Sequence, residues 1–209
     1  MSSSASIEFH GPDAAEELAR AEVYGLLAEL FYAPLSPEMF GQLRVAVTEA
    51  PMAGAFLEAS WGELVAASRR LGLAEIQAEF VALFGGVGKP AVCLFGSQYL
   101  AGSLNQKPLV ELRSALAALG LERAQTVLET EDHIASLCEV MRYLIAGEDA
   151  GVSNLTAQQR FFNSHLRGWV DGFCAALQAQ PQADFYRALA AFTRDFFAVE
   201  AQGFDLLEA

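Results

Sequence analysis

Residues 131–147 of the chain read EDHIASLCEVMRYLIAG. Six apolar side chains in this stretch recur at three- and four-residue spacing and therefore share one face of a helix: Ile134, Leu137, Cys138, Met141, Leu144 and Ile145. Asp132 stands in the first turn, where negative charge suits the helix dipole. Together with Ser136 and Glu139 it falls on a face away from the apolar stripe. The stretch predicts an amphipathic helix that is buried along one side.

The same periodicity predicts helices on both sides of this segment. Pro34 ends a first helix, Ser36 and Pro37 begin a second, and Gly147 ends the helix described above. The remaining predicted helices cover residues 52–70, 74–84, 105–119 and 156–180, with a last one from Phe185 onward. Period-two alternation, the mark of a half-buried strand, is absent. The fold class predicted from the sequence is all-α, a single globular bundle of about eight to ten helices.

The length of 209 residues suits one large domain or two small lobes. Residues 1–10 are Ser-rich and predict a flexible tail, so the all-helical domain should cover residues 11–209. Residues 147–154 are polar and carry two glycines. They predict a hinge between an N-terminal and a C-terminal lobe.

Composition excludes several classes of protein. Apolar residues make up 53% of the chain and the mean hydropathy is +0.27, but the longest run without charge, 90–106, is interrupted by Gly, Ser and Asn. It predicts no membrane insertion. The net charge of −13 disfavours nucleic acid and favours a basic partner. Three widely spaced cysteines and the lack of a secretory signal predict a cytoplasmic protein with reduced thiols.

Catalytic and metal patterns are incomplete. The run from Gly85 to Lys89 suggests a phosphate-binding loop, but Leu83 occupies its first glycine position and Pro90 stands where Ser or Thr would hold magnesium. Three histidines are too few for a di-iron bundle, and no zinc spacing is present. A Ser–His–Asp triad from Ser97, His133 and Asp132 lacks the nucleophile elbow. We therefore expect no catalytic residue, metal or cofactor, and the chain is not predicted to be an enzyme.

Two short stretches could bind a peptide. A glycine-rich loop follows Phe84 and runs into the aromatic segment 95–99, which is suited to the wall of an apolar peptide groove. The alternative is that these aromatics fill the core beneath the loop. Asp132 and His133 stand at a helix start, where they could bond a peptide backbone or an arginine. The alternative is that Asp132 only complements the helix dipole and His133 packs at the edge of the core.

These stretches resemble the TorD/DmsD/NarJ family of redox-enzyme maturation chaperones. The similarity spans nearly the whole chain. The matching segments are Leu30 to Ser36, Glu79 to Phe84 with the glycines that follow, Phe95-Gly96-Ser97-Gln98-Tyr99, Glu131-Asp132-His133-Ile134, His165 to Trp169, and the closing helix with Glu200. Asp132-His133 is the most specific of them. Cys93-Leu94-Phe95 stands where the family often has Pro-Pro-Trp, so Phe95 supplies the aromatic side chain there.

The resemblance implies a cytoplasmic chaperone that binds the twin-arginine signal peptide and the body of a molybdopterin-dependent oxidoreductase precursor. It would assist cofactor insertion and delay export until folding is complete. Asp132 would pair with the arginine side of the leader, and His133 would hydrogen-bond the peptide. The other peptide-binding residues implied are Phe84, Gly86, Pro90, Phe95, Ser97 and Tyr99.

The resemblance also implies partners and an assembly state. The client would be of the formate dehydrogenase or the DMSO/TMAO reductase type. Further partners would be molybdenum cofactor biosynthesis proteins and weakly bound GTP, and the chaperone would be a monomer or a domain-swapped dimer. Three alternatives remain open: a maturation factor for a non-exported enzyme of the nitrate reductase type, a weak nucleotide-binding protein using the loop Gly85–Lys89, and a regulatory or sensory helical bundle.

Overall fold

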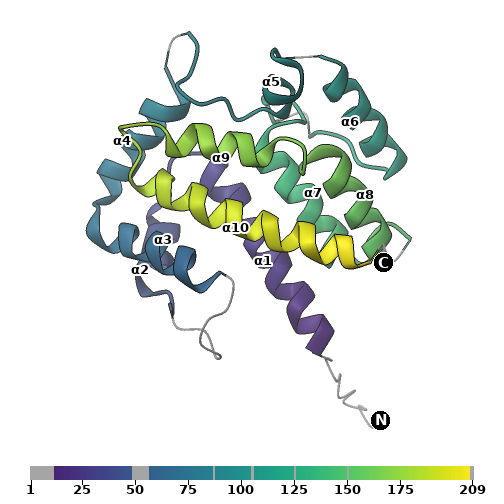
Figure 1. The fold of residues 1–209 in the computed structure, drawn as a ribbon, viewed down its shortest axis with the longest axis horizontal. Helices are drawn as coiled ribbons and strands as arrows, with labels where there is room; N and C mark the ends of the chain where they lie inside the picture. Colours follow the sequence, from purple (N-terminus) through teal and green to yellow (C-terminus); the bar gives the residue numbers. More distant parts are fainter. Residues whose placement is uncertain are drawn as a thin grey trace, which may run out of the picture.

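Ten α-helices make up the regular structure of the computed structural model, which describes residues 12–48, 57–86, 88–104, 106–124, 126–149 and 151–207 (Figure 1). The helices are α1 (Pro12–Tyr32), α2 (Pro37–Val45), α3 (Glu58–Arg70), α4 (Leu73–Phe84), α5 (Gly96–Ala101), α6 (Lys107–Ala118), α7 (Ile134–Ala146), α8 (Leu155–His165), α9 (Val170–Gln178) and α10 (Phe185–Leu206). No strand occurs in this part of the chain, and the all-α prediction is confirmed. The predicted tail, 1–10, lies outside the described residues.

Helices α1 and α7 form the most extensive helix pair of the bundle. The predicted apolar stripe of α7 is confirmed, since Ile134, Leu137, Cys138, Met141 and Leu144 are all buried. The matching face of α1 buries Tyr24, Leu27 and Phe31. In Figure 1, α9 and α10 lie in front of α1. A single apolar core contains residues of all ten helices except α5, whose Tyr99 packs against it.

The single helix predicted over residues 156–180 is wrong, because the structure divides it into α8 and α9. The break lies at Leu166–Trp169. The Trp169 indole donates a hydrogen bond of 2.7 Å to the carbonyl of His165, a group that a continuous helix would use itself. The same indole lies against Gly96, where a Cβ atom would be only 2.9 Å from the ring. A tertiary contact with the start of α5 thus overrides the local helical pattern.

A carboxylate from α4 caps the N-terminus of α10. Glu79 accepts hydrogen bonds from the backbone N–H groups of Asp184 (2.8 Å), Phe185 (3.1 Å) and Tyr186 (2.8 Å). The first N–H groups of a helix have no partner inside it, so Glu79 supplies one from a neighbouring element. The Asp184 side chain is paired with Arg70 at 2.6 Å. These bonds fix the turn before α10 against α4.

A buried polar network ties the first helix to the last. Arg20 of α1 donates two hydrogen bonds to Glu200 of α10, at 2.7 and 2.8 Å, and the Tyr24 hydroxyl adds a third at 3.0 Å. Gln158 of α8 donates to the Leu144 carbonyl of α7 and accepts from Arg20. The Glu200 side chain is only 4% exposed, and the fork of an arginine is well suited to such a carboxylate.

The segment 147–154 connects α7 to α8. Gly147 ends α7, and Asn154 caps α8 by accepting from the Ala157 N–H at 3.0 Å. The Ser153 hydroxyl donates to the Tyr143 carbonyl at 3.0 Å. Hinge motion in this connection stays a prediction.

Candidate functional site

The two stretches singled out in the sequence meet in space. The Ile134 N–H donates to the Leu94 carbonyl at 2.9 Å, and the Gly96 N–H donates to the Asp132 carbonyl at 2.9 Å. These bonds form an isolated antiparallel bridge between Phe95 and His133. The start of α5 and the start of α7 are thereby held side by side.

Asp132 caps α5 from outside that helix. One carboxylate oxygen accepts from the Ser97 N–H at 3.0 Å and from the Ser97 hydroxyl, and the other accepts from the Thr130 hydroxyl at 2.6 Å. Asp132 is 4% exposed and Ser97 is 1% exposed. Both oxygens are therefore used inside the protein. The predicted pairing of Asp132 with a leader arginine would require these bonds to open.

His133 is the N-cap of α7, and its ring is buried between two aromatic side chains. Its Nδ1 accepts from the Ala135 N–H at 3.2 Å, so the proton of the neutral ring lies on Nε2. The ring centre is 5.0 Å from Phe95 and 6.3 Å from Tyr32, both edge to face. Burial lowers the pKa of His133 to about 4. The imidazole is neutral at pH 7 and can act only as a hydrogen-bonding and packing group.

The other predicted site residues divide into two groups. Phe84 packs on Phe31 of α1, at 6.4 Å between ring centres, and Gly86 and Pro90 lie in the loop after it. Tyr99 turns inward instead, where it stacks on Trp169 at 5.5 Å and donates to the Cys93 carbonyl at 2.8 Å. The structure thus brings Phe95, Ser97, Asp132 and His133 into one cluster. Phe31 and Tyr32, the last turn of α1, connect that cluster to Phe84.

The loop Gly85–Lys89 does not have the surroundings of a phosphate-binding loop. It follows a helix, and the next helix begins only at Gly96. Gly86 and Gly88 have φ of 105° and 110°, a conformation that glycine adopts without strain. No group of side chains in the described ranges could hold a metal ion. None of the helices in those ranges combines the length and apolarity needed to cross a bilayer.

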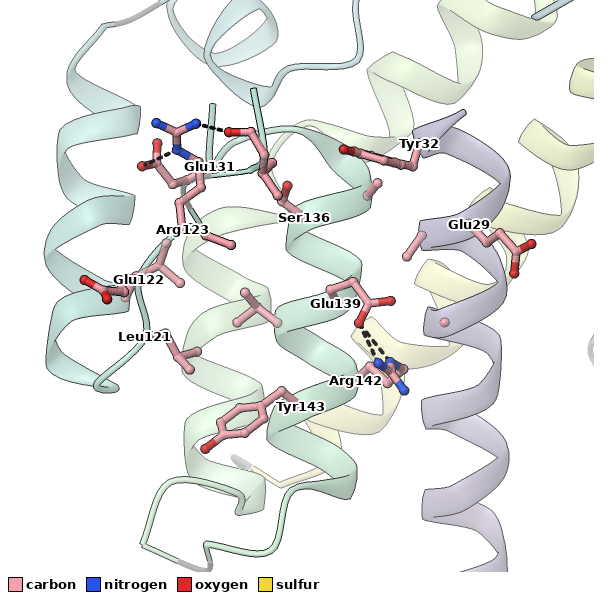
Figure 2. Close-up of a pocket in the computed structure, with 17 residues that line it drawn as sticks. Glu29, Tyr32, Leu121, Glu122, Arg123, Glu131, Ser136, Glu139, Arg142 and Tyr143 are labelled. Atoms are coloured by element: carbon pink, nitrogen blue, oxygen red, sulfur yellow. Dashed lines mark hydrogen bonds and ion pairs between the residues drawn. The ribbon is translucent and has the colours of Figure 1, made fainter. Parts of the chain in front are cut away.

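A cavity lies along the exposed face of α7, beside the His133 cluster, and we name it the α7 trough. Its volume is about 810 Å³. Figure 2 shows α7 as its floor, with α1 on one side and residues 121–124 and 126–131 on the other. The side chains that line it are mainly apolar: Ala28, Tyr32, Leu116, Leu121, Ala124, Val127, Ala135, Val140 and Tyr143. Tyr32 also touches His133, so the trough and the His133 cluster are neighbours.

Charged groups surround this apolar floor. Glu29, Glu122, Glu131 and Glu139 line the trough, against Arg123 and Arg142. Glu131 is paired with Arg113 at 2.9 Å and with Arg123 at 3.5 Å. Burial raises the pKa of Glu131, but the hydrogen bond and charge of Arg113, with the charge of Arg123, outweigh it and lower the pKa overall. The trough is therefore an apolar surface with an excess of carboxylates at its edges.

Sequence reasoning found only part of this site. It placed Ser136 and Glu139 away from the apolar stripe of α7, and both line the trough. It missed Tyr32 and the loop residues Leu121 and Val127, which contribute apolar walls. The sequence signal for Tyr32 is an aromatic residue two positions before Pro34, which ends the first helix, and in the structure its side chain is 48% exposed. The loop residues follow no periodic pattern that could have marked them.

Comparison with known proteins gives a consistent result. The family model described as nitrate reductase delta subunit matches residues 51–175. A protein of Vibrio cholerae serotype O1 named chaperone protein TorD is 30% identical over 170 residues, which is 74% of this chain and 77% of the relative. A protein of the same name from Vibrio atlanticus is 26% identical over 200 residues, which is 88% of this chain and 93% of the relative.

Proposed function

The chain belongs to the nitrate reductase delta subunit family, and we propose that it is a maturation chaperone that binds the twin-arginine leader and the body of a molybdoenzyme precursor. The family and the name of the relatives show that the chain is a redox-enzyme maturation chaperone and not an enzyme. Binding of the leader, assistance in cofactor insertion and delay of export are the proposed part of the function.

The α7 trough is the observation that supports leader binding. A twin-arginine leader joins two guanidinium groups to an apolar run, and this combination matches an apolar floor edged by Glu122 and Glu139. An amphipathic peptide helix laid in an apolar groove is a common mode of recognition. The net charge of −13 also attracts a cationic leader at long range.

The residues predicted from the sequence would act beside the trough. Phe84, Gly86, Pro90 and Phe95 would form an apolar wall for the part of the leader that leaves it. Asp132, bonded to Ser97, and His133 would hold that wall in place. Tyr99 would support them from behind. The Nε2 proton of His133 would be the one polar contact offered to the peptide backbone.

A bound leader would be kept from the export machinery while the precursor stays in the cytoplasm and receives its molybdopterin cofactor. Formate dehydrogenase and the DMSO and TMAO reductases are the predicted clients. Proteins of molybdenum cofactor biosynthesis are predicted partners in the insertion step, and weak GTP binding stays a prediction for the loop Gly85–Lys89.

Capture from the native host tests this function. The tagged chain is used as bait in extracts of cells grown under conditions that induce molybdoenzymes, and bound proteins are identified by mass spectrometry. We expect one molybdoenzyme precursor with an intact leader. Absence of any molybdoenzyme from the captured proteins, with the bait folded and recovered in full, would contradict the proposal.

The family description favours one second candidate, a maturation factor for a non-exported enzyme of the nitrate reductase type. Such a factor would bind an N-terminal peptide without needing two arginines. Replacing both arginines of the captured client's N-terminal peptide by lysine separates the two. Binding lost on replacement supports the exported client, and binding retained supports the non-exported one.

A further inference from the structure

An arginine of the protein already lies in the α7 trough. Arg142 on α7 donates to Glu139 one turn earlier at 2.9 Å, and Figure 2 shows both side chains reaching from α7 toward α1. Gly25 of α1 makes room for it, because a Cβ atom there would be 3.0 Å from the Arg142 Cδ atom. The trough therefore already contains one guanidinium group held against Glu139.

The internal pair is a weak one. The Arg142 and Glu139 side chains are 51% and 49% exposed, and an exposed pair of this kind stabilises a helix only slightly. A leader seated on the apolar floor would exclude water from Glu139. A charge pair shielded from water is stronger than the same pair in solvent. A leader arginine can therefore compete with Arg142 for the same carboxylate.

A second cavity can receive the Arg142 side chain when it is displaced from Glu139. Arg142 borders this cavity, which has a volume of about 660 Å³ and lies on the other side of α1, between α1, α2 and α3. Glu22 lines that cavity and has no ion pair among the described residues. A rotation of the Arg142 side chain past Gly25 would move its guanidinium group from Glu139 to the cavity that Glu22 lines.

We propose that the Arg142–Glu139 pair is an internal substitute for the leader, and that an arginine of the bound leader replaces Arg142 at Glu139. The proposal rests on the leader-binding function proposed above and adds the residue that receives the arginine and the one that competes with it. Glu122, which lines the trough and has no ion pair in the described part of the chain, is the carboxylate offered to the second arginine of the leader.

Titration calorimetry with purified full-length protein tests the exchange. The probes are synthetic leaders of the host's molybdoenzyme precursors, and the one that binds the wild-type protein is used further. Arg142→Gln frees Glu139, so we expect binding about two- to fivefold tighter. Glu139→Gln removes the acceptor, so we expect binding about tenfold weaker. With both leader arginines replaced by glutamine, neither substitution should change the affinity.

Arg194 and Asp171 provide matched controls. They form an exposed pair at 2.7 Å between α10 and α9 and do not line the trough. Arg194→Gln and Asp171→Asn change the net charge as the test variants do, and we expect both to bind like the wild type. A gain of affinity in Arg142→Gln cannot come from misfolding.

The possible failures can be told apart. If no leader binds the wild-type protein, the proposed function fails and the exchange fails with it. If a leader binds but Arg142→Gln does not bind more tightly, or Glu139→Gln binds equally well, only the exchange is overturned. If Arg194→Gln gains as much affinity as Arg142→Gln, net charge explains the gain and the exchange is likewise overturned.

Discussion

Asp132 lies before α7, as the sequence predicts, but its carboxylate is bonded inside the protein, and its pairing with a leader arginine stays a prediction. It precedes His133, the N-cap of α7, so the 100° rotation per residue that places Ser136 and Glu139 on the trough does not apply to it. Its carboxylate turns to the start of α5 instead. The helical spacing could predict the exposed face of α7, but it could not predict the direction of a side chain before the first helical residue.

We predict that Asp132→Ala destabilises the protein by about 2–4 kcal/mol, because it leaves the Ser97 N–H and two hydroxyl groups without their buried acceptor. Urea unfolding followed by circular dichroism measures the change. Asp132→Asn keeps the shape and one acceptor and should lose less. An Asp132→Ala variant as stable as the wild type would show that the cap contributes nothing.

His133 predicts a pH dependence with a defined sign. Its pKa of about 4 in the folded state lies below the ordinary value near 6.5, so the unfolded chain takes up a proton first as the pH falls. Stability contributed by the neutral ring is complete above pH 6.5 and is lost between pH 6.5 and 4. The loss approaches about 3 kcal/mol at the acid end.

The comparison of His133→Asn with the wild type isolates this contribution, since asparagine can still cap α7. We expect the stability of the variant to fall less steeply between pH 6.5 and 4. His165→Asn is the control for the second histidine whose pKa is lowered by burial. Parallel pH profiles for His133→Asn and the wild type would contradict the assignment.

At the scale of elements, contacts between segments explain the errors of the sequence prediction. The helical period predicted most of the α-helices correctly, including the buried stripe of α7. It did not predict α5, which has only six residues and begins with N–H groups bonded to Asp132. It also did not predict the break at Leu166–Trp169, where the indole of Trp169 donates a hydrogen bond to the end of α8. Both features depend on partners far along the chain, and local periodicity does not contain them.

The cap of α10 by Glu79 leads to a prediction for that element. Glu79→Ala leaves three backbone N–H groups without an acceptor, so we expect a loss of about 2–3 kcal/mol in urea unfolding. Glu79→Gln retains one oxygen and should lose less. Glu63→Ala, on an exposed position of α3, serves as the control. Equal stability of the Glu79→Ala and Glu63→Ala variants would refute the cap.

For the whole molecule, the family and the all-α class could be predicted from the motifs, but the trough could not. It forms where α1, α7 and residues 121–124 and 126–131 meet, and α1 lies about a hundred residues from α7 in the sequence. The motif Asp132-His133 lies at the end of the trough that Tyr32 borders. The carboxylates proposed to receive a leader lie beside it, on the face of α7 and on the wall of the trough.

Titration of the wild-type protein with a panel of twin-arginine leaders from the host's molybdoenzyme precursors tests the leader-binding function most directly. A leader that is disordered when free loses entropy on binding, so affinities in the micromolar range are expected. We predict that one leader, or one related group, binds, and that a twin-arginine leader of an unrelated exported protein does not. Binding of none, or equal binding of all, would contradict a client-specific chaperone.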